Sequence, residues 1–111
     1  VSVSTEYIVL EGTNIMVQTK DLGKGDWDTA NSMCKNSTVG GYRDWRLPTL
    51  AELAILYNNK DKIGGFTNGY YWSSSYSDYY YHYYYIDFYN GSQGAYDESD
   101  SLYVRAVRTI E

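Results

Sequence analysis

The segment from Tyr70 to Tyr89 constrains the fold of this chain most, because ten of its twenty positions are tyrosine. It reads YYWSSSYSDYYYHYYYIDFY. A hydrophobic core has little use for so many phenols, since each buried hydroxyl needs a hydrogen-bond partner. A long exposed aromatic run, in turn, favours association with other molecules. The segment therefore predicts an element that is partly core and partly functional surface.

Strand alternation divides these tyrosines into two sets. Ile86 and Phe88 share a parity that suits the core, and Tyr84 has the same parity, so we expect Tyr84 to be partly buried. The residues of opposite parity, which we expect to face outward, are Tyr83, Tyr85, Asp87 and Tyr89. The alternative is that the alternate tyrosines are themselves core-facing sheet residues.

Local start and stop signals predict the other elements. Asp26 is the expected N-cap of a helix over residues 27–35, and the sequence TLAE at 49–52 is a capping box for a helix that runs to about residue 58. Apolar alternation predicts a hairpin within residues 6–19 and strands at 70–73, 83–89 and 102–108. Residues 21–26, 37–44 and 58–69 are expected to be loops.

The order of these elements is typical of an α+β fold rather than of repeated βαβ units. We expect two helices packed on a small, mainly antiparallel sheet, with the first and last strands, near 7–10 and 102–108, paired. The chain of 111 residues has the length of one domain spanning residues 1–111. Because it starts with Val1 rather than Met, we expect it to be part of a longer protein whose targeting segment lies elsewhere.

The charge and the cysteine content narrow the possible partners. A formal net charge of −5 argues against a nucleic-acid partner and against anionic membranes. No apolar run is long enough to span a bilayer, so we expect no membrane insertion by this segment. Cys34 is the only cysteine, which excludes an internal disulfide, and its sequence context predicts a small buried helix residue.

Several motifs carry a family resemblance over nearly the whole chain. They are DLGKGDWDTANSMCKN, GGYRDWRLPTLAELAILY, GGFTNGYYWSSS, FYNG and YVRAVR. With these motifs the chain resembles the DUF1566 family of bacterial, archaeal and phage domains. The resemblance implies a C-type lectin-like fold and a ligand-binding or adhesive role. A subset of such domains resembles the variable proteins of diversity-generating retroelements, in which an error-prone reverse transcriptase mutates selected adenines of a coding repeat.

The chain departs from the family pattern where a diversified protein is expected to vary. Related domains often have an alanine–tryptophan pair where this chain has Tyr83 and Tyr84. Mutation of both adenines in an asparagine codon cannot produce Trp, Met, Gln, Lys or Glu, and none of these occurs from residue 76 to residue 90. Gln93 and Glu98 break this pattern and are expected to be fixed positions. The resemblance therefore implies a variable region at about 76–101.

Tyrosine suits a binding surface, because it offers a large contact area and a hydrogen-bonding hydroxyl at low side-chain entropy. Serine and aspartate between the rings supply adaptable polar contacts. The expected ligand-binding residues are Tyr76, Asp78, Tyr79, Tyr80, Tyr81, His82, Tyr83, Tyr85, Asp87, Tyr89, Ser92, Tyr96, Asp97, Ser99, Asp100 and Ser101.

The polar residues form no pattern typical of metal binding or catalysis. Asp97, Glu98 and Asp100 can bind a hard cation in principle, but their spacing is not that of an EF-hand, so a solvated acidic loop is expected. The only proline, Pro48, lies outside this loop, which argues against the Glu-Pro-Asn type of calcium-dependent sugar site. A lone His82 predicts neither a metal centre nor a Ser-His-Asp triad. Formylglycine-generating enzymes of related architecture use paired cysteines, which this chain lacks.

Other conspicuous residues are expected to be scaffold. Arg46 and Arg105 are expected to pair with carboxylates such as Asp44 or Glu52 and with loop carbonyls, although exposed anion contacts are the alternative. The expected core anchors are Trp27, Trp45 and Trp72, and the serines expected to bond backbone groups are Ser73, Ser74 and Ser75.

Together these patterns predict a non-enzymatic, cofactor-free, metal-free ligand-binding domain. Its expected location is a cell surface, the secreted fraction or a virion, and its expected ligand is a protein on a host or neighbouring cell. Two alternatives remain: a fixed adhesin or carbohydrate-binding module, in which the tyrosines stack on sugar rings, and a degenerate enzyme of the same fold.

Overall fold

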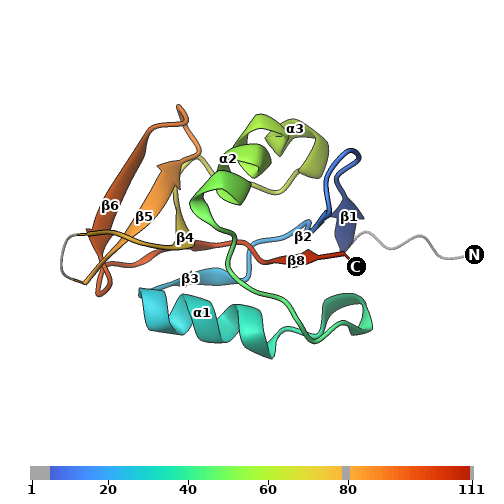
Figure 1. The fold of residues 1–111 in the computed structure, drawn as a ribbon, viewed down its shortest axis with the longest axis horizontal. Helices are drawn as coiled ribbons and strands as arrows, with labels where there is room; N and C mark the ends of the chain where they lie inside the picture. Colours follow the sequence, from blue (N-terminus) through green and yellow to red (C-terminus); the bar gives the residue numbers. More distant parts are fainter. Residues whose placement is uncertain (1–5, 79–80, 111) are drawn as a thin grey trace, which may run out of the picture.

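The computed structural model describes residues 6–78 and 81–110, which form two sheets with helices on either side (Figure 1). The three-stranded sheet has the order β1 (Tyr7–Val9), β2 (Ile15–Gln18), β8 (Val107–Thr109). The five-stranded sheet has the order β3 (Gly23–Gly25), β7 (Leu102–Val104), β4 (Tyr70–Tyr76), β5 (His82–Asp87), β6 (Gln93–Asp97). The helices are α1 (Trp27–Asn36), the 3₁₀ turn η1 (Val39–Gly41), α2 (Leu50–Asn58) and α3 (Lys60–Ile63). The predicted α+β class with mainly antiparallel pairing is confirmed.

Both predicted helix starts are confirmed. Asp26 caps α1 and accepts a hydrogen bond from the Thr29 amide at 2.8 Å. In α2 the Thr49 hydroxyl accepts from the Glu52 amide, while a Glu52 carboxylate oxygen accepts from the Thr49 amide at 2.9 Å. Such caps are local in sequence, which is why the sequence alone predicts them.

The terminal segments meet in the small sheet, with β2 between them. β1 and β2 form the predicted hairpin, in which Ile8 pairs with Val17, and β8 adds to the other edge of β2, where Val17 pairs with Val107. The expected pairing of the terminal strands is thus realised within one sheet, and the direct partner of β8 is β2 rather than β1.

The segment 102–108 was expected to be one strand, and this is wrong. It forms β7 in the large sheet and β8 in the small sheet, with Arg105 between them. The Arg105 side chain is fully buried and donates to the carbonyls of Gln18 and Gly64. Its Nη2 lies 2.8 Å from Asp21 Oδ1. Because a buried guanidinium must meet its acceptors, the strand is interrupted where this side chain enters the interior.

Two segments expected to be loops contain regular structure. Residues 23–25 form β3, which gains its strand conformation from pairing with β7. Residues 60–63 form the single turn of α3, which buries Ile63 against the core. β6 was also not expected as a strand. In each case a tertiary partner supplies the hydrogen bonds or the burial that a local pattern cannot reveal.

Different helices pack on the two faces of the large sheet. Tyr71, Ile86 and Phe88 pack with α2 in one core cluster, while Trp72 packs on the opposite face with Ala30 and Cys34 of α1. The predicted inward parity of Ile86 and Phe88 is confirmed, and Tyr84 is half-buried. Burial raises the pKa of Cys34 to about 12, which makes it an inert packing residue.

Candidate functional site

A group of tyrosines lies on the α1 side of the large sheet, beyond the part that α1 covers. α1 packs on β3, β7 and β4, whereas β5 and β6 lie farther out. We define the tyrosine face as the side chains of Tyr70, Tyr76, Tyr81, Tyr83, Tyr85 and Tyr96. Tyr83 and Tyr96 are paired across β5 and β6, so both point to the same side of the sheet.

The first half of the tyrosine face is built on Trp27. The Tyr83 ring stacks on the Trp27 indole with centroids 3.8 Å apart, and the Tyr76 ring meets Tyr83 edge-on at 5.0 Å. The indole N–H donates to the Ser73 carbonyl at 2.9 Å. The Trp27 amide donates to the Glu98 carbonyl at 2.9 Å, which ties α1 to the β6–β7 turn. Trp27 therefore connects core to surface and is half-buried, whereas Trp45 and Trp72 are the fully buried anchors that the sequence predicted.

The second half is a trio formed by Tyr70, Tyr85 and Tyr96. Tyr85 stacks on Tyr70 at 4.6 Å, and Tyr96 contacts Tyr85 and Tyr70 at 4.8 and 5.4 Å. A hydrogen bond with Tyr96 raises the pKa of the Tyr70 hydroxyl. A Cβ added at Gly94 would lie 2.6 Å from the Tyr85 hydroxyl, so this glycine lets the ring lie close against β6.

A hollow of about 310 Å³ borders this trio. Its lining includes Tyr70, Tyr96 and Tyr103, with Lys24 and Ser101 at its margin. The Lys24 ammonium lies 5.1 Å from the centroid of the Tyr103 ring, which is the distance of a cation–π contact. The hollow thus joins residues inside the expected variable region to residues outside it.

Hydrogen bonds connect the end of β4 with the residues that precede and begin β5. The Tyr81 amide donates to the Tyr76 hydroxyl at 3.0 Å, and the Glu98 amide donates to the Tyr81 carbonyl at 2.7 Å. Ser77 donates its amide to the His82 carbonyl. Tyr81 has a positive φ of 58° and is 62% exposed. The predicted ligand-binding residues Tyr79 and Tyr80 lie outside the described residues.

The acidic turn after β6 is ordered by its own hydrogen bonds. Asp97 accepts from the amide and the hydroxyl of Ser99, which lowers the pKa of the Asp97 carboxyl. The Asp100 amide donates to the Asp97 carbonyl. Across residues 6–78 and 81–110, no three His, Cys, Asp or Glu side chains converge in a way that can hold a metal ion.

The structure divides the predicted ligand-binding residues between the two ends of β5. Ile86 pairs with Gln93 at one end and His82 with Asp97 at the other. The residues at or near the tyrosine face are Tyr76, Asp78, Tyr81, His82, Tyr83, Tyr85, Tyr96, Asp97, Ser99, Asp100 and Ser101. Asp87 lies beside the tyrosine face, opposite Tyr70 of β4, whereas Tyr89 and Ser92 follow the far end of β5.

Exposure within the face differs from the expectation based on alternation. Tyr83 and Tyr85 do lie on the opposite side from Ile86, but both are half-buried because aromatic rings cover them. Tyr76 is 55% exposed. Sequence reasoning also missed Tyr70 and Trp27 as members of this surface. Tyr70 has the same strand parity as Trp72, and the pairing of β4 with β5 places both on the same side of the sheet as Tyr85.

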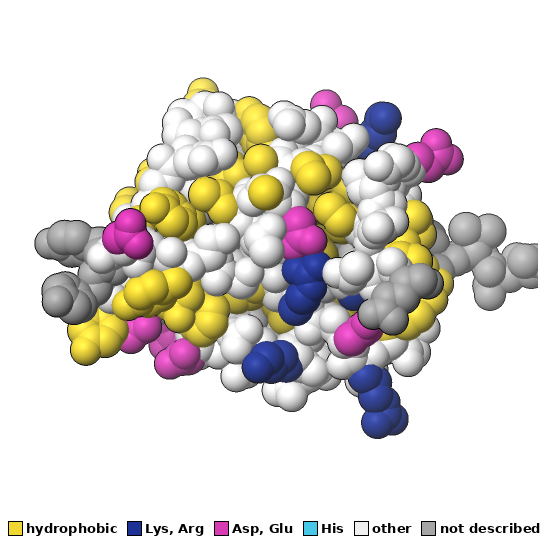
Figure 2. Space-filling model, viewed as in Figure 1, with side chains coloured by type: hydrophobic (Ala, Val, Ile, Leu, Met, Phe, Trp, Pro, Cys, Tyr) yellow, Lys and Arg dark blue, Asp and Glu magenta, His cyan; other side chains and the backbone are white. Residues whose placement is uncertain are grey.

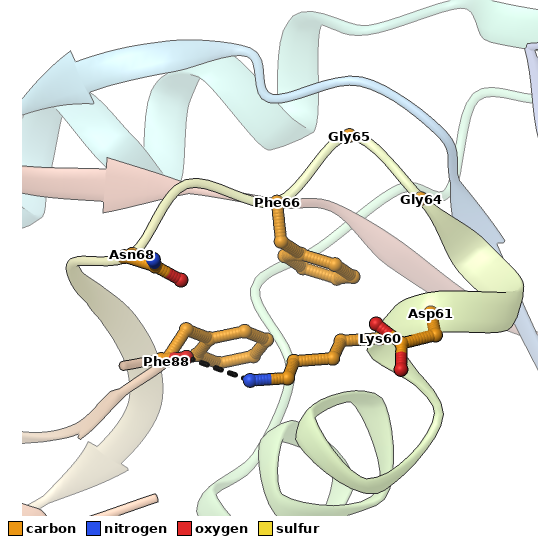
Figure 3. Close-up of a pocket in the computed structure, with 7 residues that line it drawn as sticks. All are labelled: Lys60, Asp61, Gly64, Gly65, Phe66, Asn68 and Phe88. Carbon is orange, nitrogen blue, oxygen red and sulfur yellow. Dashed lines mark hydrogen bonds between the residues drawn. The ribbon is translucent and has the colours of Figure 1, made fainter. Parts of the chain in front are cut away.

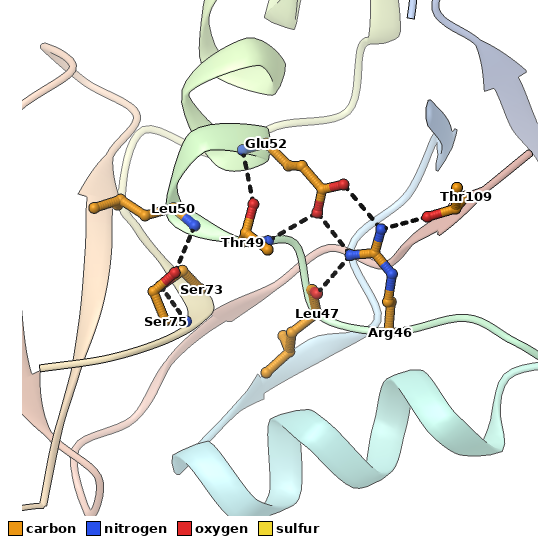
Figure 4. Close-up of polar contacts among 8 residues, drawn as sticks. All are labelled: Arg46, Leu47, Thr49, Leu50, Glu52, Ser73, Ser75 and Thr109. Atoms are coloured by element: carbon orange, nitrogen blue, oxygen red, sulfur yellow. Dashed lines mark hydrogen bonds and ion pairs between the residues drawn. The ribbon is translucent and has the colours of Figure 1, made fainter. Parts of the chain in front are cut away.

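The predicted scaffold roles of Arg46, Ser73 and Ser75 are confirmed (Figure 4), while Ser74 bonds through its backbone amide to the Pro48 carbonyl. The Arg46 guanidinium donates two hydrogen bonds, of 2.6 and 2.8 Å, to the Glu52 carboxylate and a third to the Thr109 hydroxyl. This contact lowers the pKa of Glu52. Ser75 accepts from the Leu50 amide at the start of α2, and Ser73 donates to the Tyr84 carbonyl. These polar groups connect α2 to the strands that carry the tyrosines.

Another hollow, of about 300 Å³, lies between α3 and the segment 64–68 (Figure 3). Phe66 and Phe88 point into it with ring centroids 4.6 Å apart. Lys60 donates its ammonium to the Phe88 carbonyl at 3.1 Å and lies over the Tyr57 ring. Because these contacts already use the lysine, the hollow is a packing feature of the α2 side, away from the tyrosine face.

Comparisons with known proteins place the chain in a family. Within the described residues, no helix is both long and apolar enough to cross a membrane. A search of curated proteins found no match. A family model described as the Lcl C-terminal domain matches residues 9–108, and this family is related to the DUF1566 domains that the motifs resemble. The chain therefore belongs to the Lcl C-terminal domain family.

Proposed function

We propose that this protein is a non-enzymatic binding domain that recognises its ligand with the tyrosine face. The observation that carries this proposal is a cluster of tyrosine rings on the outer part of the large sheet, beside Trp27 at the start of α1. Tyr76 and Tyr81 are more than half exposed, and exposed aromatic side chains that lie close together mark candidate interaction surfaces. The half-buried Tyr83 ring packs edge-on against the exposed Tyr76 ring and restricts its position.

Preorganisation supports a binding role for this surface. The stacked rings and the hydrogen bonds of the β4–β5 connection restrict the side chains before any ligand arrives. A rigid aromatic surface loses little conformational entropy on binding, which favours affinity. The capping box and the Arg46–Glu52 pair stabilise the scaffold behind it.

The proposed ligand is a protein on a host or neighbouring cell surface, and the protein that contains this domain acts at a cell surface, in secreted form or on a virion. Tyrosine, serine, glycine and asparagine are typical of antibody-like contact surfaces, and residues 76–101 contain all four. Apart from that of Tyr81, the rings come from three adjacent strands, β4, β5 and β6, and a contact surface spread over several strands favours a protein over a small molecule. Membership in a family related to DUF1566 domains is consistent with this role.

We further propose that the region 76–101 is diversified by a retroelement. The excess of tyrosine and the lack of Trp, Met, Gln, Lys and Glu from residue 76 to residue 90 support this idea. Sequencing the gene and its flank provides the test: asparagine-type codons at the tyrosine, serine and aspartate positions should match adenines in a nearby near-copy of the repeat, beside a reverse transcriptase gene. Random third bases and the lack of such a copy would show that the surface is fixed.

A second candidate function is carbohydrate binding by a fixed adhesin. The observation in its favour is the hollow beside Tyr70, Tyr96 and Tyr103, because sugar rings stack on aromatic rings in such pockets. Arrays of cell-surface proteins and of glycans, probed with the same domain, separate the two functions. One strong class of glycan hits without calcium favours the adhesin, and protein hits favour the primary proposal.

Variants then connect the binding to the tyrosine face. The double substitution Tyr76→Ser/Tyr96→Ser should weaken binding to any array hit at least about tenfold, because each buried aromatic contact contributes on the order of 1 kcal/mol or more. The comparison is Tyr89→Ser, which removes a ring that is 70% exposed and follows the far end of β5. Loss of binding only in Tyr89→Ser would contradict the proposal.

A further inference from the structure

Six acidic residues lie around the tyrosine face. Asp26 and Asp28 flank Trp27 at the start of α1. Asp78 follows β4, and the β6–β7 turn carries further carboxylates. The acidic rim, as we define it, consists of Asp26, Asp28, Asp78, Asp97, Glu98 and Asp100.

Neighbouring rings and carboxylates interact in this region. Burial, together with the nearby carboxylates of Glu98 and Asp28, raises the pKa of Tyr83. Glu98 also bonds through its backbone to both Trp27 and Tyr81. The rim and the rings therefore form one surface rather than two separate features.

Basic residues lie mostly elsewhere. The three ion pairs found within the described part of the chain use Arg46, Arg105 and Arg108 and involve no member of the acidic rim. Lys24, over Tyr103, is the lysine that borders the face. Figure 2 shows acidic and hydrophobic side chains together at the left end of this view, while the lysines and arginines that are visible lie toward the centre and right, among further acidic side chains.

We infer that the tyrosine face binds arginine-rich segments of a protein ligand. A guanidinium can stack on a tyrosine ring and at the same time donate paired hydrogen bonds to a carboxylate, and this surface presents both groups side by side. Charge complementarity also steers a basic partner toward the acidic end of the molecule. This inference rests on the proposed binding function and specifies the chemistry of the partner.

A blocked peptide with three arginines separated by glycines is a suitable probe. Its counterpart in which citrulline replaces each arginine keeps the planar side chain and removes the charge. In a titration followed by amide chemical shifts, we expect the arginine peptide to shift residues of the tyrosine face and the acidic rim. We expect the citrulline peptide to bind about five- to tenfold more weakly, in line with the loss of cation–π and ionic contacts.

A charge-matched pair of variants tests the location. Asp28→Asn/Asp100→Asn removes two exposed carboxylates of the rim, whereas Glu11→Gln/Asp61→Asn removes two exposed carboxylates from the β1–β2 turn and α3. The rim variant should weaken binding of the arginine peptide several-fold, and the remote variant should not. Equal weakening by both variants, or equal affinity for the citrulline peptide, overturns the inference.

This outcome is separable from that of the proposed function. If the rim variant binds a protein identified on the array as well as wild type does, while Tyr76→Ser/Tyr96→Ser has lost binding, the binding function stands and the inference of an arginine-rich partner is wrong. If both variants lose binding to that protein while the remote variant keeps it, both are supported.

Discussion

The indole of Trp27 and the phenol ring of Tyr83 lie face to face, with centroids 3.8 Å apart and planes within 6° of parallel. One residue opens α1, and the other lies in β5 within the expected variable region. This stack couples the scaffold to the binding surface. It also means that Tyr83 has a structural role that its exposed neighbours lack.

Replacement of Tyr83 should therefore reduce stability. We expect Tyr83→Ser to lower the free energy of unfolding by about 1–3 kcal/mol, because it removes the stack and uncovers Trp27. Tyr89→Ser, which alters a ring that is 70% exposed, should change it by about 0.5 kcal/mol or less. Urea denaturation checks both values. Equal stabilities of the two variants would show that the stack contributes nothing.

The backbone of Tyr81 predicts a stabilising substitution. Its φ of 58° lies in the left-handed region, which asparagine adopts more readily than tyrosine does and β-branched residues avoid. We expect Tyr81→Asn to raise the free energy of unfolding by about 0.5–1 kcal/mol and Tyr81→Val to lower it by a similar amount. Thermal melting of the two variants beside wild type provides the measurement, and a reversed order would contradict the assigned conformation.

The buried pair of Arg105 and Asp21 should be sensitive to loss of either partner. Arg105→Leu removes the counter-charge of Asp21, which keeps the hydrogen bond from the Tyr71 hydroxyl, and removes a donor from two carbonyls. Asp21→Leu leaves a buried guanidinium without its counter-charge. Each single change should cost about 3–5 kcal/mol of stability. The double substitution should cost clearly less than the sum, and strict additivity in the double-mutant cycle would show that the two groups do not interact.

Acid stability should depend on Glu52. The contact with Arg46 holds the pKa of Glu52 below its ordinary value of 4.5 in the folded protein. The resulting stabilisation is fully present above the unfolded-state pKa and is lost as the pH falls through the lower folded-state pKa. Glu52→Gln removes the charge but keeps an acceptor for the capping box, so it should cost about 1–2 kcal/mol at neutral pH.

The pH profile tests this assignment directly. Between pH 5 and the acid limit of folding, the stability difference between wild type and Glu52→Gln should shrink. A difference that stays constant over this range would show that the ionised form of Glu52 is not what stabilises the fold. The comparison uses denaturation midpoints measured at matched ionic strength, because screening also weakens partly exposed pairs.

Local sequence signals predicted the parts of the fold that depend on local contacts. Asp26 and Thr49 cap helices through residues three positions away, so both starts were found. Segments 23–25 and 60–63 were expected to be loops, because the partner that makes the first a strand is β7, far away in the sequence, and the turn at 60–63 exists only where Ile63 meets the core.

The sequence likewise did not predict the contacts in the candidate site that join residues far apart in the chain. Alternation assigned Tyr83 and Tyr85 to the side of β5 opposite Ile86, which is where they lie. It did not reveal that Trp27 covers one and Tyr70 the other. Nor did it reveal that Tyr89 and Ser92 lie at the far end of an antiparallel pair, because the linear order of residues does not state the strand register.

The sequence by itself determined the α+β class, the two helix starts, the inward parity of Ile86 and Phe88, and the concentration of tyrosine in one region, because each depends on spacing or composition. Only the tertiary structure decided which tyrosines are supports and which are exposed. Parity assigns a side chain to a face of the sheet, but burial depends on what packs against that face. Here Trp27, the first residue of α1, covers Tyr83, and on the neighbouring part of the sheet the tyrosine rings cover one another.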